Sequence, residues 1–134
     1  MSSILLDTHA IVWYLRNSPK LSAVAGERID QTIRSGDFAY LAAISLVELI
    51  YLIEKGKVTD SEFSALIDLT SSSSSGIVVA SLTTEIAIAL RQISRATVPE
   101  LPDRIIAATA LSLSLPLVTC DHKIQALTNI ETVW

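Results

Sequence analysis

The stretch ILLDTHAIVWYL, residues 4–15, places a carboxylate directly after a short apolar run and a helix-compatible segment directly after that carboxylate. The apolar run at 3–6 has the length and composition of a strand that is buried on both faces of a sheet. A charge is costly to bury, so Asp7 must either reach solvent at the end of this strand or meet a binding partner there. A second predicted strand is followed by an acid in the same way at Asp121, and both strands belong to an alternation of strands and helices along the chain.

The composition is that of one globular domain. The chain has 134 residues, enough for a single sizeable core, so we treat 1–134 as one domain. No apolar stretch approaches the roughly 20 residues that a membrane span needs, and Asp7 interrupts the only apolar run near the N-terminus, so we expect no signal peptide. The single cysteine, Cys120, excludes an internal disulfide and fits a reducing compartment. We therefore predict a cytoplasmic protein with no membrane association.

The net charge argues mildly against a protein that binds nucleic acid through a broad basic surface. The formal net charge is −4, and 18% of the residues are charged. Nucleic-acid affinity normally depends on Lys and Arg contacts with phosphates. If the substrate is a polyanion, metal ions and a few local cationic side chains must offset the negative charge of the site.

Short β-branched segments alternate with amphipathic helical segments along the whole chain. Such alternation implies crossover connections, a mostly parallel central sheet and helices on both faces, which is a three-layer α/β/α domain. Ligand sites in these folds lie beyond the carboxyl ends of the strands. The predicted strands cover 3–6, 38–43, 76–81, 116–120 and 130–134. The predicted helices include a short one reaching Leu15 and others starting at Ser22, Ser45, Thr59, Thr84, Asp103 and His122.

Four acidic residues fall where these elements join. Asp7 directly follows the first strand, and Asp121 follows the fourth within LVTCDHK. Glu48 lies in the first turn of the helix after the second strand, and Asp103 opens the helix before the fourth. Because the carboxyl ends of parallel strands meet at one edge, we expect at least Asp7, Glu48 and Asp121 to converge there, and Asp103 to join them if its helix starts at the same edge.

Helix capping offers an alternative for each acid taken alone. Ser45 and Glu48 have the spacing of a capping box, and Asp7, Asp103 and Asp121 could each be an ordinary N-cap. Capping does not, however, require all four acids to face one edge of the sheet. We therefore favour a shared functional site and leave the capping alternatives for the structure to decide.

Several carboxylates in one pocket repel one another and call for a bound cation. All-oxygen ligands point to Mg²⁺, with Mn²⁺ as a possible substitute, rather than to zinc. The residues His9, His122 and Cys120 lack the spacing of a zinc site, and we interpret His9 as a structural histidine and Cys120 as a small strand-end residue. A hard cation that keeps several waters suits phosphodiester hydrolysis. No glycine-rich phosphate loop is present to favour ATP or GTP.

Four segments carry a resemblance to a known family. They are LLDTHAIVWYL (5–15), ISLVELIYLIEKGKV (44–58), LPDRIIAATAL (101–111) and LPLVTCDHKI (115–124). In order and spacing they resemble the four acidic motifs of PIN-domain ribonucleases, and most of all the VapC-type toxins of type II toxin–antitoxin pairs. This resemblance implies a Mg²⁺-dependent endoribonuclease that hydrolyses RNA phosphodiesters with a metal-activated water. The implied catalytic and metal-binding residues are Asp7, Glu48, Asp103 and Asp121, supported by the hydroxyls of Thr8 and Thr119.

The resemblance also implies partners. It predicts a homodimer, an RNA substrate and a VapB-like antitoxin with a segment lying across the active site. The residues proposed to contact RNA are Arg16, Arg104 and Lys123, which would supply local contacts in place of a broad basic surface. The residues proposed to form an antitoxin groove are Trp13, Leu15, Leu49, Ile50 and Leu52, although apolar residues at helical spacing more commonly belong to a core.

Two other interpretations stay open. The first is a catalytically silent PIN-like module that only binds a partner, although the loss of an acid that would mark it is not seen. The second is a phospho-receiver signalling domain, which is also small, α/β and acidic. That fold needs an acceptor Asp at the end of its third strand, where this chain has Ser81, and paired acids after its first strand, where only Asp7 stands.

Overall fold

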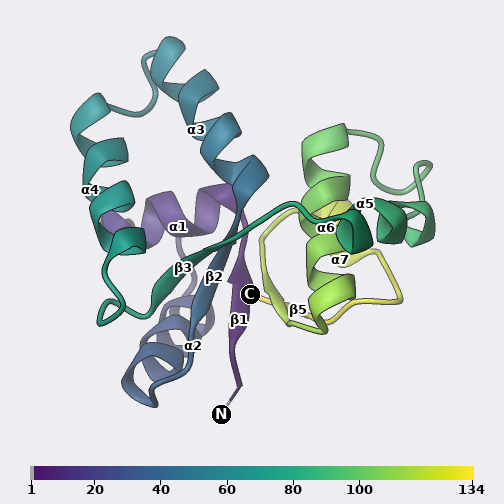
Figure 1. Ribbon diagram of the computed structural model, residues 1–134, viewed down its shortest axis with the longest axis horizontal. Helices are drawn as coiled ribbons and strands as arrows, with labels where there is room; N and C mark the ends of the chain where they lie inside the picture. The colour runs from purple at the N-terminus through teal and green to yellow at the C-terminus, as the bar shows by residue number, and fades with distance from the viewer. Residues whose placement is uncertain (1) are drawn as a thin grey trace.

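Five short strands form one all-parallel sheet in the computed structural model, which describes residues 2–134 (Figure 1). The spatial order is β3-β2-β1-β4-β5, with β1 in the centre. The α/β prediction is therefore confirmed, and the sheet is parallel throughout rather than mostly so. The strands are β1 (Ile4–Leu6), β2 (Ala39–Ala42), β3 (Ile77–Ala80), β4 (Leu117–Val118) and β5 (Thr132–Val133).

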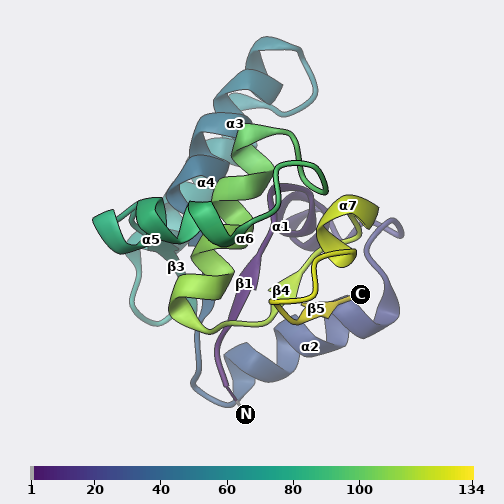
Figure 2. The ribbon, with the colours of Figure 1, turned by 90° about the vertical axis from the view of Figure 1, so that its right-hand side faces the viewer.

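Helices cover both faces of this sheet. In two perpendicular views, α1 to α4 lie on one side of β1, and α5, α6 and α7 lie on the other (Figures 1 and 2). Within residues 2–134, no helix is both long and apolar enough to cross a bilayer. The helices are α1 (Thr8–Leu15), α2 (Ala23–Arg34), α3 (Ala43–Glu54), α4 (Asp60–Ser71), α5 (Thr84–Ala89), the 3₁₀-helix η1 (Leu90–Gln92), α6 (Leu101–Leu113) and α7 (His122–Gln125).

The central strand divides the hydrophobic core into two halves. Successive side chains of a strand point to opposite faces. Ile4 and Leu6 accordingly belong to the core cluster under α1 to α4, whereas Leu5 belongs to the cluster under α5 to α7, and all three are fully buried. A charged residue within this strand would enter one of the two halves. The first acid therefore comes only after the strand has ended, at Asp7.

Several predicted boundaries were wrong by a few residues. Helix α3 begins at Ala43 rather than Ser45, and α6 begins at Leu101 rather than Asp103, with Pro102 in its first turn. Neither helix has a side-chain hydrogen bond at its N-cap, so a search for polar caps places both starts too late. The helix expected to run from Thr84 to Ile93 continues after Ala89 as η1.

The serine-rich segment 71–76 closes α4 and turns the chain into β3. The Ser75 hydroxyl donates to the Leu69 carbonyl at 2.6 Å, and the Gly76 carbonyl accepts from the Ala39 amide at 2.8 Å. Gly76 has a φ of +77°, and a Cβ added there would lie 3.1 Å from Cγ2 of Ile33 on α2. The turn thus needs glycine for both backbone conformation and space.

Replacing Gly76 with alanine should lower the free energy of unfolding by more than the same change at Gly36. Both glycines have positive φ, at a cost of about 1 kcal/mol for alanine, but a Cβ at Gly36 meets nothing within 4 Å. Urea unfolding of Gly76→Ala and Gly36→Ala measures the difference, which reports the contact with Ile33. Equal losses in the two variants would contradict a steric role for that contact.

Candidate active site

The four predicted acids line one cavity of about 410 Å³ beyond the carboxyl ends of β1, β2 and β4. Asp7 comes directly after β1, Glu48 from α3 after β2, and Asp121 from the segment after β4. Asp103 reaches the same cavity from the first turn of α6. The expected convergence of all four at one edge is therefore what the structure shows. The remaining lining residues are Thr8, His9, Trp13, Ile106 and Cys120.

Asp7 is the most enclosed of the acids, with 7% of its surface exposed. It is the N-cap of α1, and its Oδ1 accepts a hydrogen bond of 2.8 Å from the Ala10 amide. Burial raises the pKa of Asp7, and hydrogen bonds from the Thr119 hydroxyl and the Ala10 amide oppose that rise. The cap is thus compatible with a place in the cavity, because it leaves a carboxylate oxygen for another partner.

Asp121 also caps a helix while lining the cavity. Its Oδ1 accepts from the amides of Lys123 at 2.8 Å and Ile124 at 3.1 Å at the start of α7. The Asp121 amide in turn donates to Oγ1 of Thr119 at 3.1 Å. Thr119 is fully buried and contacts both Asp7 and Asp121, so its hydroxyl ties the two strand-end acids together.

The capping-box alternative for Glu48 is wrong. Ala42 is the N-cap of α3, and Ser45 lies inside the helix with its side chain fully buried. The Thr8 hydroxyl lies 2.6 Å from Oε1 of Glu48 and 2.8 Å from Oγ of Ser45. Because that hydroxyl has one hydrogen, donation to the carboxylate leaves the serine to donate to Thr8. The contact fixes Glu48 against the start of α1.

The N-cap alternative for Asp103 is also wrong, because Glu100 occupies that position and Asp103 is the third residue of α6. Burial, followed by the negative charges of Asp121, Glu48, Glu100 and Asp7 in that order, raises the pKa of Asp103 to about 6. The raised pKa of Asp103 therefore reflects its burial together with repulsion from the neighbouring acids.

The donor set of the cavity fits a hard cation better than a soft one, because its charged ligands are carboxylates. Among residues 2–134, no three His, Cys, Asp or Glu side chains are gathered tightly enough to form a ready ligand set. Spaced carboxylates suit Mg²⁺, which keeps several waters and binds through one or two carboxylates. Burial and the charges of Asp7 and Asp121 raise the pKa of the Cys120 thiol, which favours the protonated form over a nucleophilic thiolate.

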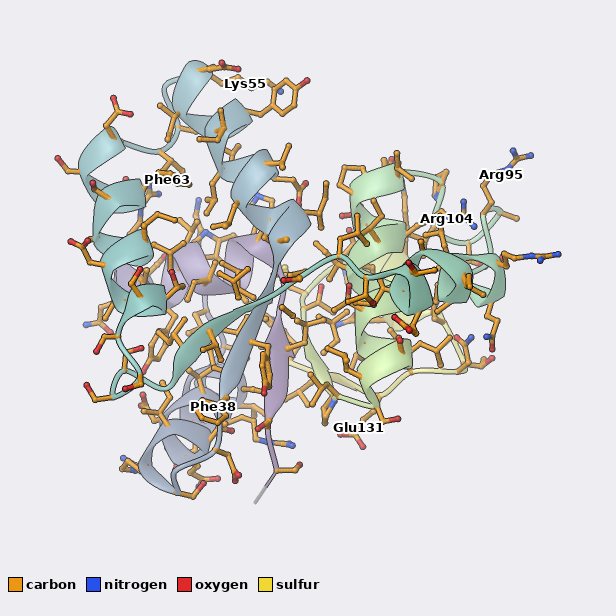
Figure 3. The ribbon with its side chains drawn as sticks, viewed as in Figure 1. Phe38, Lys55, Phe63, Arg95, Arg104 and Glu131 are labelled. Carbon is orange, nitrogen blue, oxygen red and sulfur yellow. The ribbon has the colours of Figure 1, made fainter. Side chains whose placement is uncertain are left out.

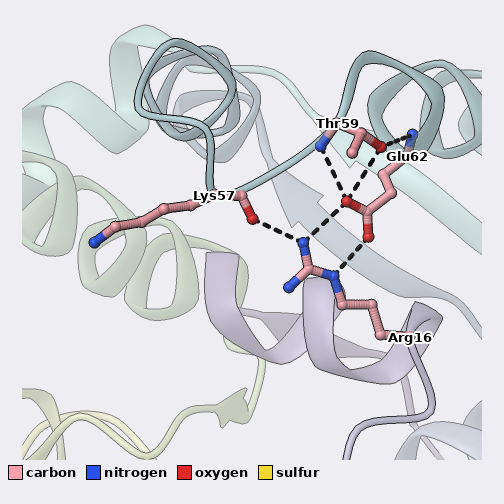
Figure 4. Close-up of polar contacts among 4 residues, drawn as sticks. All are labelled: Arg16, Lys57, Thr59 and Glu62. Carbon is pink, nitrogen blue, oxygen red and sulfur yellow. Dashed lines mark hydrogen bonds and ion pairs between the residues drawn. The ribbon is translucent and has the colours of Figure 1, made fainter.

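Arg16, a predicted RNA contact, is not among the residues that line the cavity. At the end of α1, its Nε lies 2.5 Å from Oε2 of Glu62, and its Nη2 donates to Oε1 of Glu62 at 2.9 Å and to the Lys57 carbonyl at 2.8 Å (Figure 4). Glu62 also completes the predicted capping box with Thr59. Hydrogen bonds from the Arg16 guanidinium and, to a smaller extent, from the Thr59 amide lower the pKa of Glu62 to about 2. This pair joins α1 to the start of α4.

The other two predicted RNA contacts also have protein partners. Nη2 of Arg104 donates to the carbonyls of Leu90 and Ile93, both at 2.9 Å, and so ties α6 to η1 on the helical layer of α5 and α6 (Figure 3). Nζ of Lys123 lies 3.3 Å from Oε1 of Glu100. Neither side chain is among those lining the cavity, and a role for either in RNA binding stays a prediction.

Two aromatic residues of the cavity depart from the sequence prediction. The sequence predicts a structural role for His9, but its side chain is exposed and lines the cavity. Trp13 was placed in an apolar groove, and it too lines the cavity. Their spacing of four residues on α1 was a signal that both share one face. Periodicity alone did not show that this face meets the acids.

A separate apolar hollow of about 210 Å³ lies between α1, α3 and α4. Leu15 and Leu49 line it, as predicted for the groove, together with Phe63, which lies on α4 (Figure 3). Ile50 and Leu52 are not among its lining residues. Ile50 is exposed, whereas Leu52 packs against the core.

Comparison with known proteins identifies the family. The model for the PIN domain matches residues 4–129, which is most of the chain. This protein belongs to the PIN domain family. A search of curated proteins found no match to this PIN domain.

Several solved structures share the fold of this PIN domain. DNA-bound VapBC2 from Rickettsia felis matches with a TM-score of 0.72 and 18% identity over 98% of this chain and 97% of the matched chain. DNA-bound VapBC from Salmonella typhimurium matches with a TM-score of 0.72 and 24% identity over the same shares. FitAcB from Neisseria gonorrhoeae matches with a TM-score of 0.62 and 25% identity over 96% of this chain and 95% of the matched chain.

Replacing Asp103 with asparagine should remove a pH-dependent loss of stability from the metal-free PIN domain. The folded-state pKa of about 6 lies above the ordinary value of 3.8, so the folded protein holds this proton more tightly than the unfolded chain does. Stability is therefore fully present at low pH and declines as pH rises through this window. Urea unfolding with EDTA at pH values from about 4 to about 7, for wild type and Asp103→Asn, isolates the contribution.

The control for this experiment is Asp68→Asn, which changes an exposed acid on α4. The difference in unfolding free energy between Asp103→Asn and wild type should grow in favour of the variant with rising pH, while the control difference stays flat. A flat difference for Asp103→Asn would contradict the raised pKa.

Two changes at Glu62 should separate its cap from its ion pair. Glu62→Gln keeps a side chain able to complete the capping box but loses the charge, so we expect a loss below about 1 kcal/mol for this partly exposed pair. Glu62→Ala loses both interactions and should cost about 1–2 kcal/mol. Thermal and urea unfolding measure both variants. An equal effect of the two would show that the cap contributes nothing.

Proposed function

We propose that this PIN domain is a divalent-metal-dependent endoribonuclease and acts as the toxin of a VapBC-type toxin–antitoxin pair in the cytoplasm. The observation that carries the proposal is one cavity lined by Asp7, Glu48, Asp103 and Asp121, which come from four separate segments of the chain. The fold shared with the VapBC structures and the match to the PIN model support it.

The four carboxylates would hold one or two Mg²⁺ ions, or Mn²⁺, directly or through water. A bound cation of this kind supplies a Lewis acid that activates water and offsets the charge developing on a phosphodiester. The protein's part is to hold the carboxylates in place. Thr8 positions Glu48, and Thr119 positions both Asp7 and Asp121. Both threonines are buried, so they have little freedom to turn away.

The acids also require a cation before RNA approaches. An RNA phosphate entering a pocket of four carboxylates meets like charge, and burial already raises the pKa of Asp7 and Asp103. A cation removes that repulsion and favours the ionised carboxylates. We therefore expect metal binding and RNA binding to be linked.

We extend the proposal to an antitoxin partner. The hollow between α1, α3 and α4 is lined by apolar side chains that include Leu15, Leu49 and Phe63, and it can take apolar residues of a helical segment. The net charge of −4 and the acidic cavity favour a cationic segment, and a guanidinium could substitute there for the metal. Such a partner would block the site that it covers.

A homodimer is the second assembly that we propose. Large apolar side chains are exposed on α3 at Val47, Ile50 and Tyr51 and on α5 at Ile88. Exposed apolar groups of this size on neighbouring turns of one helix are typical of surfaces that are covered in an assembly.

Cleavage of total cellular RNA by the purified protein tests the activity. With Mg²⁺ or Mn²⁺ we expect discrete fragments that EDTA prevents. Asp7→Asn and Asp121→Asn should each reduce cleavage by at least about 100-fold, because they remove proposed metal ligands. Both variants should fold, since asparagine can still cap α1 and α7 as aspartate does.

Asp68→Asn, which changes an exposed acid on α4, is the matched control and should cleave like wild type. Wild-type cleavage rates in Asp7→Asn or Asp121→Asn would refute the assignment of these ligands. No cleavage by folded, antitoxin-free wild type, even with Mn²⁺, would favour the silent binding module instead.

A further inference from the structure

An aromatic wall flanks the acids inside the proposed active site. His9 and Trp13 lie on successive turns of α1 and line the same cavity as the four carboxylates. Their ring centroids are 5.5 Å apart, with the ring planes tilted by 46°. Asp7 caps this same helix, so the position of the wall relative to the acids is set by one short rigid element.

Trp13 is held in place from outside the cavity. The Trp134 ring lies edge-on to it, with centroids 5.9 Å apart and the planes at 61°. Trp134 follows β5 and itself packs against the hydrophobic core. A Trp side chain supported in this way loses little freedom when a ligand covers its remaining surface, and this favours binding.

Core packing does not account for the position of Trp13. Its neighbours Val12 and Tyr14 pack against the core, whereas Trp13 lines the cavity and is only half-buried. Phosphodiester hydrolysis by metal and carboxylates needs no indole ring beside it. The ring does offer a flat π-face, which is the surface that unpaired nucleobases use when they bind proteins.

We propose that Trp13, with His9 beside it, is the platform on which an unpaired base next to the scissile phosphate stacks. This inference rests on the proposed ribonuclease function and adds a substrate requirement to it. The RNA must present an unstacked base at the cleavage site, as loops and single strands do. Because every base has a π-face, the platform supplies affinity and position rather than base identity.

Binding of RNA to a non-cleaving protein tests the platform. The parent is the full chain with Asp121→Asn, and the probe is a short fluorescein-labelled single-stranded RNA of random sequence, measured by fluorescence anisotropy with Mg²⁺. Trp13→Leu, added to this parent, keeps apolar volume but removes the π-face, and should weaken binding by roughly 5- to 100-fold. Trp13→Phe keeps a ring and should restore most of the affinity.

Phe38→Ala is the matched control, because Phe38 is an exposed aromatic residue at the amino end of β2 and away from the acids (Figure 3). Its ring lies at a tilt of 57° to that of Tyr40, with the centroids 6.0 Å apart. It should bind RNA like the parent. Circular dichroism and thermal unfolding check that each variant is folded.

The outcomes separate the two proposals. A parent that binds RNA, with Trp13→Leu binding equally well or with Trp13→Phe binding as weakly as Trp13→Leu, would overturn the stacking platform and leave the nuclease standing. A folded parent that binds no RNA would overturn the stacking platform, which is proposed to supply affinity, and cleavage of RNA by the wild type then decides the nuclease separately. Loss in Trp13→Leu with recovery in Trp13→Phe supports the platform.

Discussion

Mutual repulsion of carboxylates at one edge of a parallel sheet is the constraint on which the rest of this structure depends. Asp7 and Asp121 are the N-caps of α1 and α7 and accept hydrogen bonds from backbone amides there, and the Thr8 hydroxyl donates to Glu48. For Asp103, burial and the surrounding negative charges raise the pKa to about 6, and the N-cap of its helix is Glu100. The fold thus stabilises the acids locally, yet leaves them needing a cation.

Capping and metal binding are compatible for two of these acids. Asp7 and Asp121 each accept backbone hydrogen bonds through one oxygen, which leaves the other for the cavity. The same bonds fix the direction of the carboxylate, because the amides that donate them belong to the first turn of a helix that follows a strand of the sheet, α1 after β1 and α7 three residues after β4. A cap at this position orients a ligand as well as stabilising a helix.

The sheet and the convergence of the acids could be predicted from sequence, because short apolar segments followed directly by acids restrict the possible topologies. The exact helix starts could not. Ala42 and Glu100 are the N-caps of α3 and α6 and make no side-chain hydrogen bond there, so no Ser, Thr, Asp or Asn cap marks either start. The partners of Arg16 and Arg104 are side chains and carbonyls distant in sequence, and only the packing of α4 and η1 shows them.

The negative charge of the protein makes the aromatic wall significant. A chain with net charge −4 cannot depend on many phosphate contacts, and Arg16 and Lys123 already pair with Glu62 and Glu100. Stacking on Trp13 depends on apolar surface and π-contact, so the negative charge of the protein weakens it little. It would also place the base beside the acids, where a bound cation would attract the phosphate. Recognition of an unpaired nucleotide then follows from two different forces acting on two parts of the same nucleotide.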